Sequence, residues 1–393
     1  MSMNDTPVSE RIRISLFGCR NAGKSSLLNA VAGQHIAVVS DIKGTTTDPV
    51  QKTMELLPAG PVVFTDTPGL DDEGVLGSMR VAAAQNVLNK TDVAVVVVDA
   101  AVGMSDADRD VVRRIEEKEV PYILVYNKSD LVPAENRESG KIYVSAANGE
   151  GIRELKERIA LLAKHAEKEK PIVGDLVRKN DFVVLVVPID KAAPKGRLIL
   201  PQQQVIRDLL ENGAVPIVTR DTELESVLER LGDRVALVIT DSQVFGKVAP
   251  LVPENIPLTS FSILFARYKG ELAYQLEGLR AIDSLTDGDT VLVSEGCTHH
   301  RQCGDIGTVK IPAMLKKITG KDIRIAVTSG QEFPTSLQEY KVIIHCGGCM
   351  LSEKEMKARI ASARAQNVPI TNYGMVLAYG SGTLQRSIRI LGL

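Results

Sequence analysis

The chain contains few cysteines, no long apolar run and no excess of positive charge. Five cysteines among 393 residues are too few, and odd in number, for a disulfide scaffold. The densest apolar stretch, Val93 to Val98, is far shorter than the roughly 18 residues that a membrane-spanning helix needs. The first residues lack the apolar segment of a secretory signal. We therefore expect a cytoplasmic protein with no membrane partner.

Charge and composition exclude further classes of protein. The 47 basic and 49 acidic residues nearly cancel, so no basic excess favours sequence-independent binding to nucleic acid, and we expect no nucleic-acid partner. Hydrophobic residues make up 44% of the chain and charged residues 24%, which is ordinary for globular proteins and excludes a disordered chain. At about 150 residues per domain, the length predicts two or three domains.

Short apolar runs alternate with helical patterns along the chain, which is typical of an α/β fold. Continuous runs such as Ala94–Val98 predict strands buried on both faces, as in a parallel sheet covered by helices. The lysine-rich stretch Lys164–Lys170, followed by Pro171, predicts a first linker. The predicted strands of the first block are Ile12–Phe17, Val62–Thr65, Val93–Asp99, Tyr122–Tyr126 and Ile142–Val144. We expect α/β domains at residues 1–170, 171–269 and 270–393.

The middle block lacks the residue patterns that are typical of a catalytic or ligand-binding site. It has apolar strand-like segments at Phe182–Pro188, Val215–Thr219 and Val235–Thr240, but no cysteine, no histidine and no glycine-rich phosphate loop. This pattern indicates a structural or interaction module. The third block again has an α/β pattern, with predicted strands at Val291–Glu295 and Lys341–His345.

A phosphate-binding loop follows the first predicted strand. The residues Gly18-Cys-Arg-Asn-Ala-Gly23-Lys24-Ser25 have the P-loop spacing between a strand and a helix. Glycines let successive backbone N–H groups point at phosphate oxygens, Lys24 reaches the β- and γ-phosphates, and Ser25 offers its hydroxyl to Mg²⁺. The loop therefore predicts a P-loop nucleotide site.

Three further motifs, in order along the chain, identify the nucleotide as GTP. Asp66-Thr-Pro-Gly69 ends a predicted strand, where Asp66 holds a magnesium water and the Gly69 amide senses the γ-phosphate. In Asn127-Lys128-Ser-Asp130 the carboxylate matches the N1–H and N2–H₂ donors of guanine, and Ser145-Ala146-Ala147 supports the base. The expected nucleotide-binding residues are Gly18, Asn21, Gly23, Lys24, Ser25, Ser26, Asp66, Asn127, Lys128, Asp130, Ser145 and Ala146.

Two sequence features indicate which branch of GTPases the chain resembles. The position after Gly69 is Leu70, so the glutamine that often orients the attacking water is missing. The segment Gly44-Thr-Thr46-Thr-Asp48 resembles the switch of the TrmE-Era-like, tRNA-modification branch of GTPases, which also carries an Asn where this chain has Asn21. That resemblance implies that Asn21 helps to bind K⁺ and that Thr46, with Ser25, contacts Mg²⁺. The expected catalytic residues are Lys24, Asn21, Thr46 and Gly69.

The third block gathers soft metal ligands. Cys297-Thr-His299 and His345-Cys346-Gly-Gly-Cys349 lie 45 residues apart, each after a predicted strand. Thiolates select zinc, copper(I) or iron–sulfur clusters. Closed zinc coordination by three cysteines and a histidine, or a 4Fe-4S cluster with three cysteine ligands, both fit the pattern, and the residues themselves do not decide between them.

A TrmE-Era-like GTPase joined to a C-terminal CxH…HCxxC region resembles the HydF family, the GTPases that mature FeFe hydrogenase. The resemblance implies a homodimer, formed through the middle domain, that binds a 4Fe-4S cluster through Cys297, Cys346 and Cys349. It also implies a carrier that receives a two-iron precursor with the help of radical-SAM maturases and passes it to the FeFe hydrogenase apoprotein.

The fourth iron of such a cluster has several candidate ligands. In a carrier, a weakly bound ligand at this iron can be displaced by an incoming cofactor ligand. We therefore expect His299, His345, Asp305 or an external ligand there. We expect Cys303 and His300 not to bind the cluster. The alternative is that the histidines bind no iron and instead tune the cluster through hydrogen bonds to its sulfur atoms. The competing function is a regulatory or tRNA-modification-type GTPase with a structural zinc site.

Overall fold

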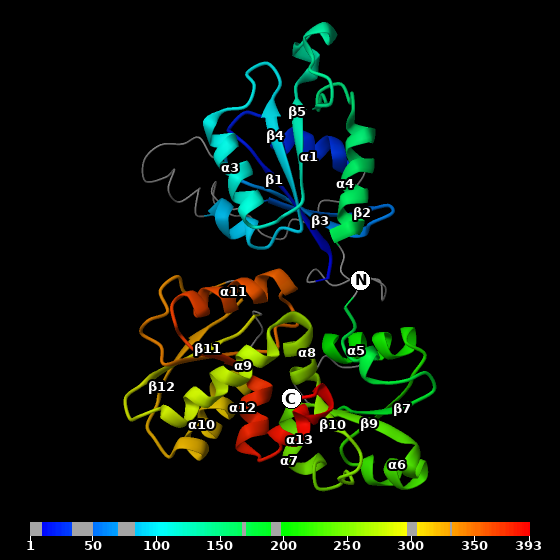
Figure 1. Cartoon of the computed structure of the whole chain (residues 1–393), viewed down its shortest axis with the longest axis vertical. Helices are drawn as coiled ribbons and strands as arrows, with labels where there is room; N and C mark the ends of the chain where they lie inside the picture. Colours follow the sequence, from blue (N-terminus) through cyan, green and yellow to red (C-terminus); the bar gives the residue numbers. More distant parts are fainter. Residues whose placement is uncertain are drawn as a thin grey trace. The chain divides into compact units, whose positions relative to one another are not determined.

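The computed structural model describes residues 10–33, 50–69, 83–166, 170–189, 198–296, 305–330 and 332–393. The chain divides into two compact units, Met1–Glu169 and Lys170–Leu393, and each unit is α/β (Figure 1). In the described part of the chain no helix is both long enough and apolar enough to cross a membrane.

The first unit is built on a six-stranded sheet with the order β2-β3-β1-β4-β5-β6. Its strands are β1 (Ile12–Phe17), β2 (Val50–Leu56), β3 (Gly60–Asp66), β4 (Val93–Asp99), β5 (Tyr122–Asn127) and β6 (Ile142–Tyr143). Strand β2 runs antiparallel to β3, and the other neighbours are parallel. The five strands predicted for this block are therefore confirmed, and β2 is an addition that the sequence pattern did not reveal.

The central strand β4 is buried on both faces, as its continuous apolar run predicted. Val93, Val95 and Val97 pack into one core with α1 (Lys24–Ala32) and α4 (Ile152–Ala166). The alternate residues of the strand pack into a second core with α3 (Asp106–Glu117). Because successive side chains of a strand point to opposite faces, a sheet with helices on both faces requires such a run.

The expected first linker begins later than the sequence indicated. Helix α4 continues through Lys164 and His165 to Ala166. Basic residues in the last turn of a helix interact favourably with its C-terminal carbonyls, so a lysine-rich sequence here extends the helix. On the far side of the predicted linker, Lys170 donates hydrogen bonds to the carbonyl oxygens of Arg267 and Tyr268 in the second unit.

The second unit contains two four-stranded parallel sheets. The first sheet has the order β10-β9-β7-β8, and its strands are β7 (Phe182–Val186), β8 (Val215–Thr219), β9 (Val235–Thr240) and β10 (Leu258–Ser260). The second has the order β12-β11-β13-β14, and its strands are β11 (Thr290–Ser294), β12 (Arg324–Thr328), β13 (Val342–His345) and β14 (Ile370–Asn372).

One hydrophobic core joins these two sheets. It combines Val184 and Val238 of the first sheet with Val293 and Ile344 of the second, so residues from both predicted domains share it. Each sheet packs its other face against a separate core. The helices of this unit are α5 (Leu200–Glu211), α6 (Leu224–Leu231), α7 (Phe245–Val248), α8 (Phe261–Lys269), α9 (Leu272–Leu279), α10 (Ile311–Thr319), α11 (Glu353–Ala365), α12 (Tyr373–Gly380) and α13 (Leu384–Ile388).

Candidate functional site

The loop between β1 and α1 has a backbone that only particular residues adopt easily. Gly18, Asn21 and Gly23 have φ angles of 140°, 62° and 87°. A Cβ atom on Gly18 would lie 2.2 Å from the carbonyl oxygen of Val97, and one on Gly23 would lie 2.3 Å from Nδ2 of Asn127. Glycine is therefore required at both ends of the loop, and Asn is one of the few other residues that tolerate φ > 0.

Lys24 is held inside this loop. Its side chain is buried, and its Nζ atom donates hydrogen bonds to the carbonyl oxygens of Gly18 at 2.9 Å and Cys19 at 2.8 Å. These contacts place the ammonium group within the loop whose N–H groups are expected to bind phosphate. The contact of Lys24 with the β- and γ-phosphates stays a prediction.

Asp66 fits the predicted magnesium site. Ser25 donates a hydrogen bond to Oδ2 of Asp66, while Oδ1 is buried and has no hydrogen-bond partner among the described residues. Burial raises the pKa of this carboxyl, and the hydrogen bond from Ser25 and the charge of Lys24 oppose that rise. A buried carboxylate oxygen without a partner, beside a hydroxyl, provides the hard oxygen donors that Mg²⁺ prefers.

The base-recognition residues form a second group, which is tied to the phosphate loop by Asn127. Its Nδ2 donates to the carbonyl oxygen of Ala22 at 2.9 Å, and its Oδ1 accepts from the N–H of Ala146 at 3.1 Å. Ser145 donates a hydrogen bond to Oδ1 of Asp130, which fixes the carboxylate expected to bind guanine. The side chain of Lys128 forms an ion pair of 2.6 Å with Asp99 at the end of β4.

A cavity of about 530 Å³ brings three of the motifs together. Motif residues that line it are Asn21, Gly23, Lys24, Ser25, Ser26, Asp66, Gly69 and Lys128. These residues come from the carboxyl ends of β1, β3 and β5, which is where open α/β sheets bind ligands. Thr46 and Leu70, the predicted switch residues, lie outside the described residues.

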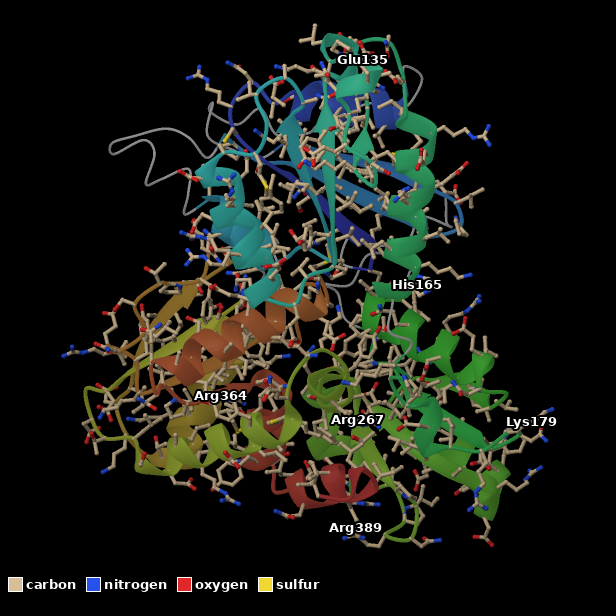
Figure 2. The ribbon with its side chains drawn as sticks, turned by 45° about the horizontal axis from the view of Figure 1, so that its top comes forward. Glu135, His165, Lys179, Arg267, Arg364 and Arg389 are labelled. Carbon is tan, nitrogen blue, oxygen red and sulfur yellow. The ribbon has the colours of Figure 1, made fainter. Side chains whose placement is uncertain are left out.

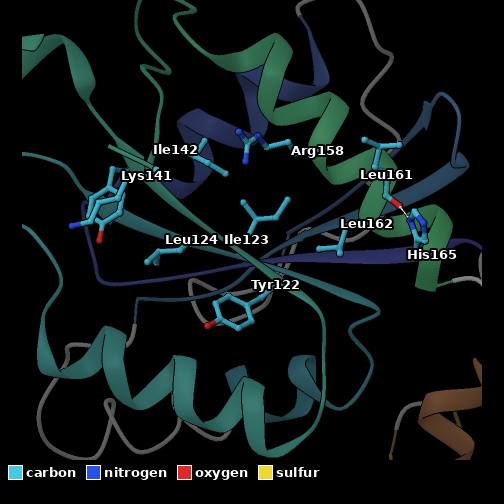
Figure 3. Close-up of a pocket in the computed structure, with 11 residues that line it drawn as sticks. Tyr122, Ile123, Leu124, Lys141, Ile142, Arg158, Leu161, Leu162 and His165 are labelled. Atoms are coloured by element: carbon cyan, nitrogen blue, oxygen red, sulfur yellow. Dashed lines mark hydrogen bonds between the residues drawn. The ribbon is translucent and has the colours of Figure 1, made fainter. Parts of the chain in front are cut away.

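A second cavity of about 490 Å³ lies elsewhere in the first unit (Figure 3). Strand β6 is two residues long and pairs with Val125 and Tyr126 of β5. The cavity lies beside the preceding part of β5 and is lined by Tyr122, Ile123, Leu124, Tyr126, Gly140, Lys141, Ile142, Arg158, Leu161, Leu162 and His165. None of the GTP motifs contributes to its lining, so it is not the candidate nucleotide site.

The candidate cluster loop follows β13 and holds Cys346 and Cys349. The Sγ atom of Cys346 accepts hydrogen bonds from the N–H groups of Gly296 at 3.0 Å and Gly348 at 3.4 Å. Burial raises the pKa of the Cys346 thiol to about 11 and also raises the pKa of Cys349, whose rise is opposed by the charge of Lys269. Both cysteines are half-buried. A sulfur that accepts backbone N–H groups, as that of Cys346 does, suits a thiolate bound to a metal, whose charge lowers thiol pKa values.

His345 lies beside this loop in the interior. It is fully buried, its Nδ1 donates to the carbonyl oxygen of Cys346 at 2.8 Å, and its Nε2 accepts from Arg359 at 3.0 Å. Burial, followed by the charge of Arg359, lowers its pKa to about 3. Both ring nitrogens are therefore engaged in hydrogen bonds in this structure, and a role of His345 as ligand to the fourth iron stays a prediction.

Asp305 acts as a helix cap in this structure. Its Oδ2 accepts hydrogen bonds of 2.9 Å from the N–H and the hydroxyl of Thr308, at the start of the short helix Ile306–Lys310. Cys297, His299, His300 and Cys303 lie outside the described residues. Within the residues that the structure does describe, no group of three or more His, Cys, Asp or Glu side chains is placed to hold a metal ion.

Sequence reasoning missed three buried charged residues around the cysteine loop. Arg359 and Glu355 of α11 form an ion pair of 3.3 Å, and Lys269 of α8 reaches the loop from the middle block. All three are at most 4% exposed. Glu355 and Arg359 have the i, i+4 spacing of a helical ion pair, but only burial distinguishes this pair from the exposed pairs on other helices.

Three family models match the chain. Residues 13–128 match the model described as 50S ribosome-binding GTPase. Residues 172–270 match the Hydrogen maturase F dimerization domain, and residues 273–390 match the Hydrogen maturase F tetramerization domain. The last two matches together span more than half of the chain. The block that the sequence predicted to bind a cluster is thus the block that matches a tetramerization domain.

Curated relatives resemble part of the chain. The tRNA modification GTPase MnmE of Nitrosomonas europaea is 36% identical over 43% of this chain and 38% of its own length. GTPase Der of Kosmotoga olearia is 27% identical over 49% of this chain and 48% of its own length. The chain therefore spans less than half of these relatives. The solved structure of Era from Aquifex aeolicus bound to GDP.AlF4- matches 57% of this chain and 98% of its own length, at 21% identity and a TM-score of 0.34.

Proposed function

Because the chain belongs to the hydrogen maturase F family, we propose that it is a GTP-hydrolysing scaffold that binds a 4Fe-4S cluster and delivers a two-iron precursor to FeFe hydrogenase. The presence of both hydrogen maturase F domains behind a GTPase domain supports the proposal. The single observation that carries the cluster assignment is the loop after β13, where the half-buried Cys346 accepts hydrogen bonds from two backbone N–H groups at its sulfur.

The proposed cluster ligands are Cys297, Cys346 and Cys349. His345 uses both ring nitrogens in hydrogen bonds, and Asp305 caps a helix. This leaves His299 or an external ligand as the best candidate for the fourth iron. When bound, the cluster supplies an iron with an exchangeable ligand, to which a cargo ligand can attach. The N–H groups of Gly296 and Gly348 hold the Cys346 sulfur in place.

The GTPase part of the proposal assigns one role to each group in the cavity. Lys24 and the P-loop N–H groups bind the phosphates, Ser25 and Asp66 hold Mg²⁺ and its water, and Asp130 recognises guanine. Asn21 lines the cavity and is the proposed contact for K⁺, which would supply positive charge in the absence of a water-orienting glutamine. Thr46 completes the magnesium site and Gly69 senses the γ-phosphate in this proposal.

The proposed assembly follows the three blocks 1–170, 171–269 and 270–393. The matches to a dimerization and a tetramerization domain show that the chain belongs to an oligomer-forming family. We assign homodimer formation to the middle block, and interaction with the hydrogenase apoprotein and the radical-SAM maturases to the assembled protein. Light scattering and chemical cross-linking of the full chain test the first assignment, since a dimer whose cross-links all lie outside residues 171–269 would contradict it.

Anaerobic reconstitution with iron and sulfide tests the cluster proposal. The wild-type chain is expected to bind iron and sulfide, to absorb at roughly 400 nm, and to activate hydrogenase apoprotein. Cys346→Ser should lose the iron and the activation. Cys19→Ser is a matched control, because it also removes one thiol but lies in the P-loop, where its Sγ is 3.1 Å from the Ser105 hydroxyl. Wild-type protein without iron, or iron retained in Cys346→Ser, would refute the assignment.

A GTPase with a structural zinc site is the second candidate. The identity to tRNA modification GTPases favours it, although that likeness covers less than half of the chain. Metal analysis of anaerobically purified protein separates the two candidates. One tightly bound zinc ion and no iron would support the zinc-site GTPase, whereas about four irons per chain would support the carrier.

A further inference from the structure

Lys269 connects the middle block to the cysteine loop. It is the last residue of α8 and is only 3% exposed. Its Nζ atom donates to the carbonyl oxygen of Leu351 at 2.8 Å and lies 3.3 Å from the carbonyl oxygens of Gly348 and Cys349. An ammonium group has three donors, and here all three acceptors belong to one turn of the chain around Cys349.

Helix α8, which carries Lys269, is held on two sides by hydrophobic packing. Leu264 and Phe265 of α8 pack into the core on one side, and Ile263 and Ala266 pack into the core shared by the two sheets. The cation two residues earlier, Arg267, which is labelled in Figure 2, pairs instead with Asp175 at 3.0 Å. Lys269 therefore contacts the loop from the end of a helix that is packed into two hydrophobic cores.

A buried positive charge beside cysteines has an electrostatic consequence. Taking an ammonium group out of water is costly, and nearby negative charge offsets that cost. The Nζ atom of Lys269 lies 3.3 Å from the carbonyl oxygen of Cys349, so its charge is held beside the turn that carries this cysteine. A second buried cation near the loop, Arg359, is paired with Glu355 and donates a hydrogen bond to His345. Its charge is therefore already balanced by a carboxylate.

We propose that Lys269 is a positioning residue for the Cys346–Cys349 loop, and that its ammonium charge compensates the negative charge of a thiolate-bound metal group. The part that concerns the cluster rests on the proposed function. Three thiolates give a 4Fe-4S site net negative charge, and reduction adds one more negative charge. A fixed cation nearby therefore favours the reduced form. The middle block, which lacks chemical motifs of its own, thereby contributes a residue that tunes the site.

Lys269→Gln separates charge from positioning, because glutamine keeps N–H donors for the loop carbonyls but is neutral. In the full chain reconstituted with iron and sulfide, this variant should retain iron while its reduction potential, followed by electron paramagnetic resonance, becomes more negative. Lys269→Met, which removes the donors as well, should also lose part of the iron. Arg267→Met is the matched control, since it removes a cation from the same helical turn that faces Asp175, and it should leave the potential unchanged.

A zinc titration of the metal-free chain distinguishes failure of this inference from failure of the proposed function. If wild-type protein binds no iron, the cluster proposal fails, but Lys269→Met should still weaken zinc binding by about tenfold or more, as expected for loss of hydrogen bonds from a charged group. Unchanged zinc affinity in Lys269→Met would overturn the positioning role. A potential unchanged in Lys269→Gln, or shifted equally in Arg267→Met, would overturn the electrostatic role.

Discussion

The Nη1 atom of Arg359 lies 3.0 Å from Nε2 of His345, and both side chains are buried. The Nη2 atom of Arg359 donates to the carbonyl oxygen of Gly330 at 2.9 Å and is paired with Glu355. This network fixes the imidazole that directly precedes Cys346. The fold therefore holds one end of the cysteine loop through α11, while Lys269 of α8 holds the other.

Arg359→Met should destabilise the protein strongly. It leaves the buried Glu355 carboxylate without its cation, a change that typically costs about 3 kcal/mol or more. Lys357→Met on the same helix is the matched control, because Lys357 pairs with Glu353 at 2.7 Å, where the side chains are 50% and 34% exposed. That loss should cost about 0.5 kcal/mol or less. Denaturant unfolding of both variants measures the difference, and equal midpoints would contradict a structural role for the buried pair.

His345→Gln should leave a cluster in place. Both ring nitrogens are used in hydrogen bonds, so removing the imidazole removes no metal ligand in this arrangement. Iron content should stay at the wild-type level after anaerobic reconstitution. The electron paramagnetic resonance signal should keep the symmetry of the wild-type cluster. A changed ligand signature, comparable with that of a His299 variant, would show that the imidazole leaves Arg359 and binds iron when the cluster is present.

Asp130→Asn should change the base preference of the nucleotide site. The carboxylate, fixed by the Ser145 hydroxyl, offers two acceptors to guanine, and the amide replaces one of them with a donor. Affinity for GTP should fall by about a hundredfold or more, while affinity for xanthosine triphosphate should rise. Fluorescent nucleotide binding measures both. The exposed Asp106→Asn serves as a control with the same change of charge, and GTP binding unaffected in Asp130→Asn would refute the assignment of the motif.

Potassium should accelerate GTP hydrolysis through Asn21. Phosphate release is expected to be faster in potassium chloride than in sodium chloride at equal ionic strength. Asn21→Gly is the sharper variant here, because the backbone at this position has φ of 62° and glycine keeps that conformation while losing the side chain. The variant should hydrolyse GTP at the same rate in both salts. A potassium preference that survives in Asn21→Gly would place the cation contact elsewhere.

Asp66 should make the nucleotide-free protein less stable as pH rises. Burial raises the folded-state pKa above the unfolded value of 3.8, so the folded chain binds the proton more tightly. The resulting stability is fully present below the unfolded pKa and is lost as pH rises through the folded pKa. Asp66→Asn should therefore unfold at a higher temperature than wild type at neutral pH, with a smaller difference in acid, while losing magnesium-dependent hydrolysis. A melting-temperature difference independent of pH would contradict this.

The placement of the GTP motifs at the ends of strands could be predicted, because each motif and each strand is a short stretch of sequence. A continuous apolar run such as Val93–Asp99 specifies a strand buried on both faces, and the structure contains that strand. Glycine at positions 18 and 23 specifies a loop with φ > 0. The residues that follow each strand then lie at one edge of a parallel sheet. The cavity there is lined by the predicted residues Asn21, Gly23, Lys24, Ser25, Ser26, Asp66 and Lys128, whereas the predicted residues Gly18, Asn127, Asp130, Ser145 and Ala146 do not contribute to its lining.

The surroundings of the cysteine loop depended on tertiary structure. Lys269 and the carbonyls it binds are 79 to 82 residues apart in sequence, and a lysine at the end of a helix ordinarily suggests a solvated C-terminus. His345 matched a ligand pattern, but the packing of α11 brings Arg359 to its Nε2 atom, and its Nδ1 atom donates to the carbonyl oxygen of Cys346. Sequence periodicity records which face of an element is apolar. It does not record which distant polar groups become buried together, because that depends on how the two sheets pack around their shared core.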